Sequence, residues 1–152
     1  MTEAKKPDFL YLNRPTIEHL HASLSAWAIE RGDEPIPPFS KARIEQLDSL
    51  VEAPRRRFEG RDMYPTLEEK AAIVFYSINK QQIFLNGNKR MSTLCLLVFL
   101  AINDKWLQMP PDELTAKALW LANTPSLDFP RIKQELAEWI REHLIELPDS
   151  LK

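Results

Sequence analysis

The chain has 152 residues, 44% of them hydrophobic, with a formal net charge of −2, three glycines and one cysteine. Because Gly32, Gly60 and Gly87 are isolated, the phosphate loops G-x-x-x-x-G-K and G-x-G-x-x-G are excluded, and tight hairpins and barrels are disfavoured. The near-neutral charge supplies no general attraction for nucleic acid or an anionic membrane, so we expect one mainly helical domain over residues 1–152.

The first two segments predict amphipathic helices. Pro15-Thr16 opens the first, and Gly32 supplies its stop. After a proline-rich connector, Ser40 is expected to cap the second, which continues until Pro54 ends it. Both segments carry apolar residues at helical spacing, so each should bury one face.

The middle of the chain predicts two central helices joined by a short loop. Thr66 and Glu69 form the T-x-x-E capping box at the start of the first of these helices. The helical pattern breaks at Phe84–Gly87 and then resumes, apolar nearly all round, over about 88–105. We expect this second helix to be the buried centre of an all-α bundle, with Phe84 anchoring the loop in the core.

Two further helices are expected near the C-terminus, with Asp112 and Asp128 as their N-caps. The four tryptophans fall in four different segments, and the simplest interpretation is that all of them pack around the central helix: Trp27, Trp106, Trp120 and Trp139. No repeat or second domain is visible in the sequence.

The lone cysteine and the N-terminal sequence bear on the compartment. Cys95 lies in an apolar run, so there is no disulfide framework and no Cys/His metal spacing. The N-terminus lacks an apolar signal core, and the longest apolar run, Leu94–Ile102, is shorter than the ~20 residues of a membrane-spanning helix. We expect a cytoplasmic protein that does not bind membranes.

The start of the central helix carries two cations, Lys89 and Arg90. A helix N-terminus is already positive, so cations there are unfavourable by roughly 0.3–1 kcal/mol unless an anion lies nearby. Gly87 would let the backbone turn and expose N–H groups, which predicts an anion site. The alternative is that Gly87 only ends the preceding helix and that the cations are solvated or paired with Glu68 or Glu69.

The segment from Gln82 to Arg90 reads Q-I-F-L-N-G-N-K-R. It resembles the H-x-F-x-[D/N]-[A/G]-N-K-R motif of the Doc toxins, a branch of the Fic family. The resemblance extends in order to Arg43–Pro54, Phe58–Gly60, Tyr64–Ala72 and Phe99-Leu100, in the middle of the chain. It implies a Fic-type all-α fold in which the motif joins two central helices.

The resemblance also implies a transferase that uses ATP or another nucleoside triphosphate with Mg²⁺ on a protein hydroxyl. Most Fic proteins add the nucleoside monophosphate, whereas Doc-type toxins transfer phosphate to a translation elongation factor. By this analogy Gly87 and Asn88 would supply a backbone cradle and a polar side chain, and Lys89 and Arg90 would neutralise phosphate charge. Asn86 stands where many relatives have a magnesium-binding carboxylate and would be a weaker ligand.

Gln82 stands in the place of the motif histidine, which serves as general base in the family. An amide has no basic site at neutral pH, and loss of a positioned base costs ~10²–10⁴ in rate, so an impaired enzyme is expected. A natural loss of chemistry and a deliberate substitution both fit Gln82. Thr93 stands where adenylylating relatives have a second arginine, which favours phosphate transfer. No inhibitory S/T-x-x-x-E-G/N segment is found, so restraint of an active relative would need a separate antitoxin.

A basic stretch precedes the first central helix, where Fic relatives have a flap that docks the target. Its members, with the tyrosine that follows them, are candidate contacts for a target protein or an antitoxin: Arg55, Arg56, Arg57, Arg61 and Tyr64. The alternative is a solvated loop face, and four arginines in a near-neutral chain do not predict nucleic-acid binding. A non-catalytic interaction module on the same scaffold is the second functional hypothesis.

Overall fold

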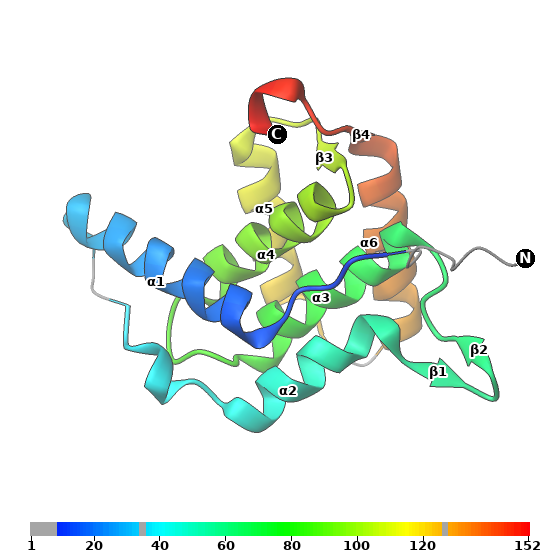
Figure 1. The fold of residues 1–152 in the computed structure, drawn as a ribbon, viewed down its shortest axis with the longest axis horizontal. Coiled ribbons are helices and arrows are strands. Elements are labelled where there is room, and N and C mark those ends of the chain that lie inside the picture. The colour runs from blue at the N-terminus through cyan, green and yellow to red at the C-terminus, as the bar shows by residue number, and fades with distance from the viewer. Residues whose placement is uncertain (1–8, 34–35, 126–127) are drawn as a thin grey trace, which may run out of the picture.

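A computed structural model describes residues 9–33, 36–125 and 128–152 (Figure 1). In this part of the chain there are six α-helices: α1 Arg14–Glu30, α2 Ile44–Glu52, α3 Leu67–Gln81, α4 Asn88–Ile102, α5 Pro111–Asn123 and α6 Phe129–His143. Two small antiparallel pairs join β1 (Arg57–Phe58) to β2 (Arg61–Asp62) and β3 (Lys105–Leu107) to β4 (Leu144–Glu146). The expected all-α class is confirmed.

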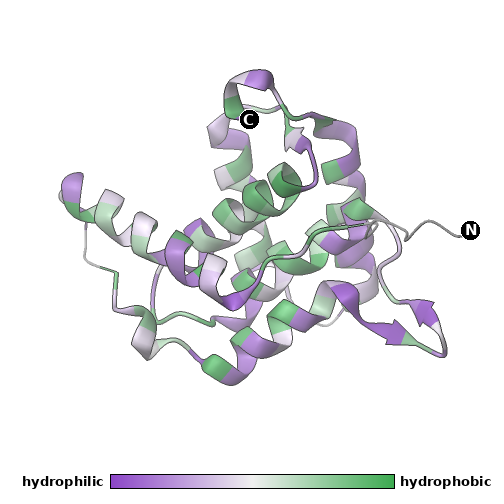
Figure 2. Cartoon of the chain, in the orientation of Figure 1, coloured by the Kyte–Doolittle hydropathy of each residue, from purple (hydrophilic) through white to green (hydrophobic). Residues whose placement is uncertain are grey.

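Helices α3 and α4 form the centre of the bundle. They pack along each other, with α6 and α5 against α3, and α5 and α1 against α4. Figure 2 shows hydrophobic residues along most of α4. Its fully buried apolar side chains belong to the main core: Met91, Cys95, Leu96, Phe99 and Leu100. The prediction of a buried central helix after the loop is therefore confirmed.

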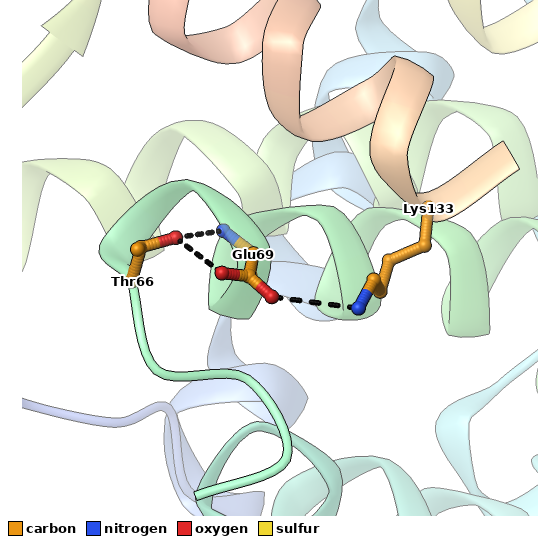
Figure 3. Close-up of polar contacts among 3 residues, drawn as sticks. All are labelled: Thr66, Glu69 and Lys133. Atoms are coloured by element: carbon orange, nitrogen blue, oxygen red, sulfur yellow. Dashed lines mark hydrogen bonds and ion pairs between the residues drawn. The ribbon is translucent and has the colours of Figure 1, made fainter. Parts of the chain in front are cut away.

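The start of α3 is fixed by the expected capping box, drawn in Figure 3. Thr66 Oγ1 accepts a hydrogen bond of 3.1 Å from Glu69 N, and the Thr66 hydroxyl donates to Glu69 Oε1 at 3.1 Å. Glu69 Oε2 also lies 3.4 Å from Lys133 Nζ on α6. The cap therefore starts α3 and ties it to α6.

Two expected helix caps are wrong. Ser40 lies inside a short 3-10 helix, η1 (Phe39–Lys41), and α2 starts at Ile44 with Arg43 as its N-cap. Arg43 N donates a 2.7 Å hydrogen bond to Ile83 O in the loop after α3, so a tertiary contact sets the start of α2. Asp112 lies within the first turn of α5, because Pro111 occupies the first helical position, where its fixed φ suits a helix.

Asp128 occupies the expected N-cap position of α6, but its side chain makes no capping hydrogen bond and pairs with Arg131 at 3.1 Å. Helix α4 ends at Ile102 and not near 105, because Asp104, with φ of 63°, turns the chain into β3. Trp27 also departs from expectation: it is 41% exposed near the end of α1, beneath the guanidinium of Arg31.

The β1–β2 hairpin was not expected from so few glycines. Its two central residues, Glu59 and Gly60, have φ of 51° and 78°. Positive φ at both positions is the signature of a type I′ turn, which matches the twist of a two-residue hairpin. A single glycine, Gly60, is therefore enough for this two-residue turn. The hairpin projects from the bundle beside the start of α3 (Figure 1).

Candidate functional site

The loop between α3 and α4 begins and ends with residues in the left-handed region. Gln82 ends α3 with φ of 48° and ψ of 54°. Gly87, with φ of 80°, immediately precedes α4, and its carbonyl accepts the first helical hydrogen bond from Met91 N at 2.8 Å. Gln82 ends the preceding helix, so the alternative in which Gly87 does this is wrong.

The side chain of Asn88 closes this loop. Its Oδ1 accepts a 3.0 Å hydrogen bond from Phe84 N, and its Nδ2 donates a 2.7 Å hydrogen bond to Phe84 O. Both polar atoms of the amide therefore bind main chain. The backbone N–H and the second hydrogen of Nδ2 are the donors left at this position.

The aromatic ring of Phe84 is 3% exposed and lies in the core. It stacks on His21 of α1 with ring centroids 4.9 Å apart, and Phe39 lies 6.0 Å away. Burial lowers the pKa of His21, which favours a neutral ring beside the loop. Sequence reasoning missed His21, although it lies four residues after the buried Ile17 and so on the same helix face.

The first turn of α4 has the features of an anion site. It carries no acidic residue, and no side chain from the described residues caps it. The N–H groups of Asn88, Lys89 and Arg90 precede the first helical donor, so they have no partner within the helix. Lys89 forms no ion pair with any described residue, whereas Arg90 Nη1 lies 3.6 Å from Asp33 Oδ2.

A cavity of about 620 Å³ opens over this turn, and we refer to it as the loop cavity. The loop forms one wall of this cavity, α3 contributes Asn79 and Lys80, and Asp33 comes from the segment that follows α1. Lys80 Nζ donates to the carbonyls of Ala122, at 3.3 Å, and Thr124, at the end of α5, and burial lowers its pKa. The described residues that line it are Asp33, Ile36, Asn79, Lys80, Gln82, Ala122 and residues 85–90.

The lining charges are unequal in number. Among the lining residues that the structure describes, Lys80, Lys89 and Arg90 are cationic and Asp33 is the one carboxylate. With the positive end of α4 added, the cavity favours an anionic ligand.

A model of the Fic/DOC family matches residues 11–100, which include α1 to α3, the whole loop and α4 as far as Leu100. This chain belongs to the Fic/DOC family. Over 94 residues it is 34% identical to Toxin Doc of Mycolicibacterium smegmatis, and the match covers 60% of this chain and 71% of that protein. No solved structure gives a significant match. Among the described helices of this Fic/DOC chain, none has the length and apolar character needed to cross a bilayer.

Asn86, expected from the sequence to be a weak magnesium ligand, is exposed at the cavity wall. Its Oδ1 accepts a 2.7 Å hydrogen bond from Gly87 N. Residues 9–33, 36–125 and 128–152 contain no group of three His, Cys, Asp or Glu side chains that could hold a metal ion. Asn86 therefore offers magnesium a single neutral amide oxygen, which is already hydrogen-bonded to Gly87 N.

The arginine stretch does not reach the loop cavity of this Fic/DOC chain. None of the arginines lines that cavity. The stretch precedes α3 and the loop follows α3, so the length of this 15-residue helix, ~22 Å, separates them along the chain. The side chains also diverge: Arg55 lies 4.5 Å over the Tyr11 ring, Arg57 pairs with Asp62 at 3.3 Å, and Arg61 is exposed on β2.

Proposed function

We propose that the loop cavity binds the phosphates of ATP, and that this chain is a Doc-like transferase whose chemical step is impaired at Gln82. The observation that carries the proposal is the uncapped first turn of α4, which faces a cavity with three cationic side chains. A volume of about 620 Å³ lies within the ~300–1,000 Å³ typical of small-molecule sites.

The phosphates would be held mainly by main chain and by two cations. The N–H groups at the start of α4 can donate to phosphate oxygens, as helix N-termini do in other anion sites. Lys89 is free of ion pairs with the described residues, and Arg90 offers a planar fork that matches two phosphate oxygens. A magnesium ion would rely on phosphate oxygens of the nucleotide for most of its ligands, with Asn86 as a weak additional donor.

The impaired step is the removal of a proton from the attacking hydroxyl. In phosphate transfer the protein hydroxyl oxygen bonds to the γ-phosphorus, ADP leaves, and the hydroxyl proton must pass to a base. Gln82 lies at the cavity wall but cannot take that proton. None of the three histidines lines the cavity: His19 is exposed on α1, His21 is buried against Phe84, and His143 lies 3.3 Å from Glu113.

The test is to supply the missing base. Gln82→His should raise transfer by ~10²–10⁴, measured as label passed to protein in a cell extract. Label from γ-³²P-ATP would indicate phosphate transfer, and label from α-³²P-ATP would indicate nucleotide transfer. Gln82→Asn is the matched control and should remain inactive. A histidine variant that binds ATP, labels nothing and leaves cell growth unchanged would contradict the proposed chemistry.

We propose the acceptor protein and the antitoxin from membership of the Fic/DOC family. The matching protein of M. smegmatis is named Toxin Doc. By extension we propose a protein acceptor such as a translation elongation factor, and an antitoxin that would restrain an active form.

The second candidate is a non-catalytic interaction module. Two observations favour it: Gln82 lacks a basic atom, and Arg90 is already paired with Asp33. Titration calorimetry separates the two candidates. ATP binding that is lost in the Lys89→Ala, Arg90→Ala double variant supports the first, whereas no ATP binding by the parent chain at millimolar nucleotide supports the second.

A further inference from the structure

A second cavity, of about 230 Å³, lies along α3 between α2 and the start of α6. We refer to it as the α3 side cavity. It shares no described lining residue with the loop cavity, and its polar lining residues are Ser49, Arg56, Tyr64, Tyr76, Ser77 and Gln81. It therefore needs an explanation of its own.

Among the described residues that line this cavity, Arg56 is the one cation and none is acidic. Its Nη2 donates to Ser49 Oγ at 2.7 Å and more weakly to Ser49 O at 3.4 Å. Within the described ranges Arg56 forms no ion pair, although its neighbour Arg57 is paired with Asp62. The guanidinium is thus oriented by a serine while its charge remains unmatched.

Two buried hydroxyls line the same cavity without a partner. Tyr64 is 5% and Ser77 is 2% exposed, and neither hydroxyl forms a hydrogen bond with another described residue. In the described part of the chain, Asn79 Oδ1 is the side-chain atom that is fully enclosed and unpaired, so these two hydroxyls remain open to the cavity. Burial raises the pKa of Tyr64, partly opposed by the charge of Arg56, so the phenol remains a donor at neutral pH.

Size and charge restrict the ligand. Small-molecule sites usually measure ~300–1,000 Å³, so 230 Å³ suits a single side chain better than a nucleotide. One guanidinium matches the single charge of a carboxylate, whereas a phosphate monoester carries ~1.5–2 negative charges. The neutral hydroxyls add donors for carboxylate oxygens without adding charge.

We propose that the α3 side cavity binds the carboxylate of an Asp or Glu side chain on a protein partner. The neighbouring surface fits such a partner, because Met63, whose N–H donates to Arg56 O at 2.9 Å, is 45% exposed and Phe58 is 68% exposed. An acidic residue beside apolar residues would therefore meet complementary chemistry on this face.

The position of the cavity relates the partner to the proposed chemistry. Gln81 lines the α3 side cavity and Gln82, the next residue, lines the loop cavity. A protein anchored by its carboxylate at Arg56 would have to extend along α3 to reach the phosphate site, because Arg56 precedes this helix and the loop follows it. This step rests on the proposed function, and it makes the acceptor a protein segment in which an acidic residue and the accepting hydroxyl lie apart along α3.

The test uses the full chain and a defined probe. N-acetyl-glutamic acid methylamide is titrated into ¹⁵N-labelled protein, with its glutamine counterpart as the neutral probe. The expected result is a shift of the Ser77 and Gln81 amide signals and of Arg56 Nε–H with the acidic probe alone. Arg56→Gln should weaken binding by about tenfold, since a charge-assisted hydrogen bond is lost. Arg61→Gln removes the same charge from the same stretch and should bind as the parent does.

Several results would overturn the inference. Equal binding of the neutral probe, or equal weakening in Arg61→Gln, would show that no specific carboxylate site exists. Binding of phosphoserine methylamide more than tenfold tighter than the glutamate probe would make phosphate the ligand instead. Ser77→Ala serves if Arg56→Gln fails to fold, because it should weaken binding by a few-fold without a change in charge. These titrations contain no ATP, so they do not depend on the phosphate site. If the parent chain binds the acidic probe but, in a separate titration, does not bind ATP, the proposed function alone is contradicted.

Discussion

The two hydrogen bonds between Asn88 and the main chain of Phe84 should contribute measurably to stability. Each intramolecular hydrogen bond contributes about 0.5–1.5 kcal/mol net, so Asn88→Ala removes about 1–3 kcal/mol. Alanine returns up to about 0.7 kcal/mol through its better helix propensity at the start of α4. The expected loss is about 1–2 kcal/mol in the free energy of unfolding, which lowers Tm by about 2–8 °C for a domain of this size.

Urea unfolding and differential scanning calorimetry measure this loss directly. Asn86→Ala is the matched control, because Asn86 is exposed and its side chain accepts a hydrogen bond from the adjacent Gly87 N–H; its cost should stay within about 0.5 kcal/mol. An Asn88→Ala variant with parental stability and greatly weakened ATP binding would refute the reasoning, since the amide would then serve the ligand and not the loop.

Three further predictions follow from buried or paired groups. Burial lowers the pKa of His21, so the unfolded chain takes up a proton at higher pH than the folded chain does. The free energy of unfolding should therefore fall as the pH drops below about 6.5. The variant His21→Phe should flatten this dependence, measured as urea midpoints between about pH 7 and 5. Asp33→Asn should tighten ATP binding about two- to fivefold by calorimetry, because a carboxylate that competes for Arg90 is removed. Cys95 is fully buried and burial raises its pKa to about 12, so Ellman's reagent at pH 8 should react only after unfolding in urea.

Each of these predictions has a control or an opposing result. His19→Gln, on the exposed face of α1, should keep the parental pH dependence, and an unchanged slope in His21→Phe would count against the burial argument. Glu45→Gln removes an exposed acid from α2 and should leave ATP affinity unchanged. Rapid labelling of Cys95 in the folded protein would show that α4 opens far more readily than its packing implies.

The elements that the sequence predicts correctly are those whose signal lies in neighbouring residues. The capping box at Thr66 and Glu69 lies within four residues, and the apolar run of α4 is visible at a glance, so both elements are found. The start of α2 depends on the bond from Arg43 N to Ile83 O, forty residues away along the chain, and no local pattern reveals it. The β1–β2 hairpin depends on Glu59 in an unusual conformation, which propensity disfavours.

The candidate site divides in the same way. The loop is predicted because Lys89 and Arg90 have the wrong sign for a helix start, and this conflict lies in adjacent residues. Only the folded chain brings three further residues to the loop: Lys80 from α3, His21 from α1 and Asp33 from the segment after α1. The closure of the loop by both atoms of the Asn88 amide was likewise invisible from the sequence.

The left-handed backbone at Gln82 has a consequence for the substitution of histidine at this position. Among residues other than glycine, histidine, asparagine and aspartate enter this region several-fold more often than average. With φ of 48° and ψ of 54°, the end of α3 thus holds a backbone shape that suits the histidine of the family motif better than it suits glutamine. Introducing histidine at position 82 should therefore need no rearrangement of the loop.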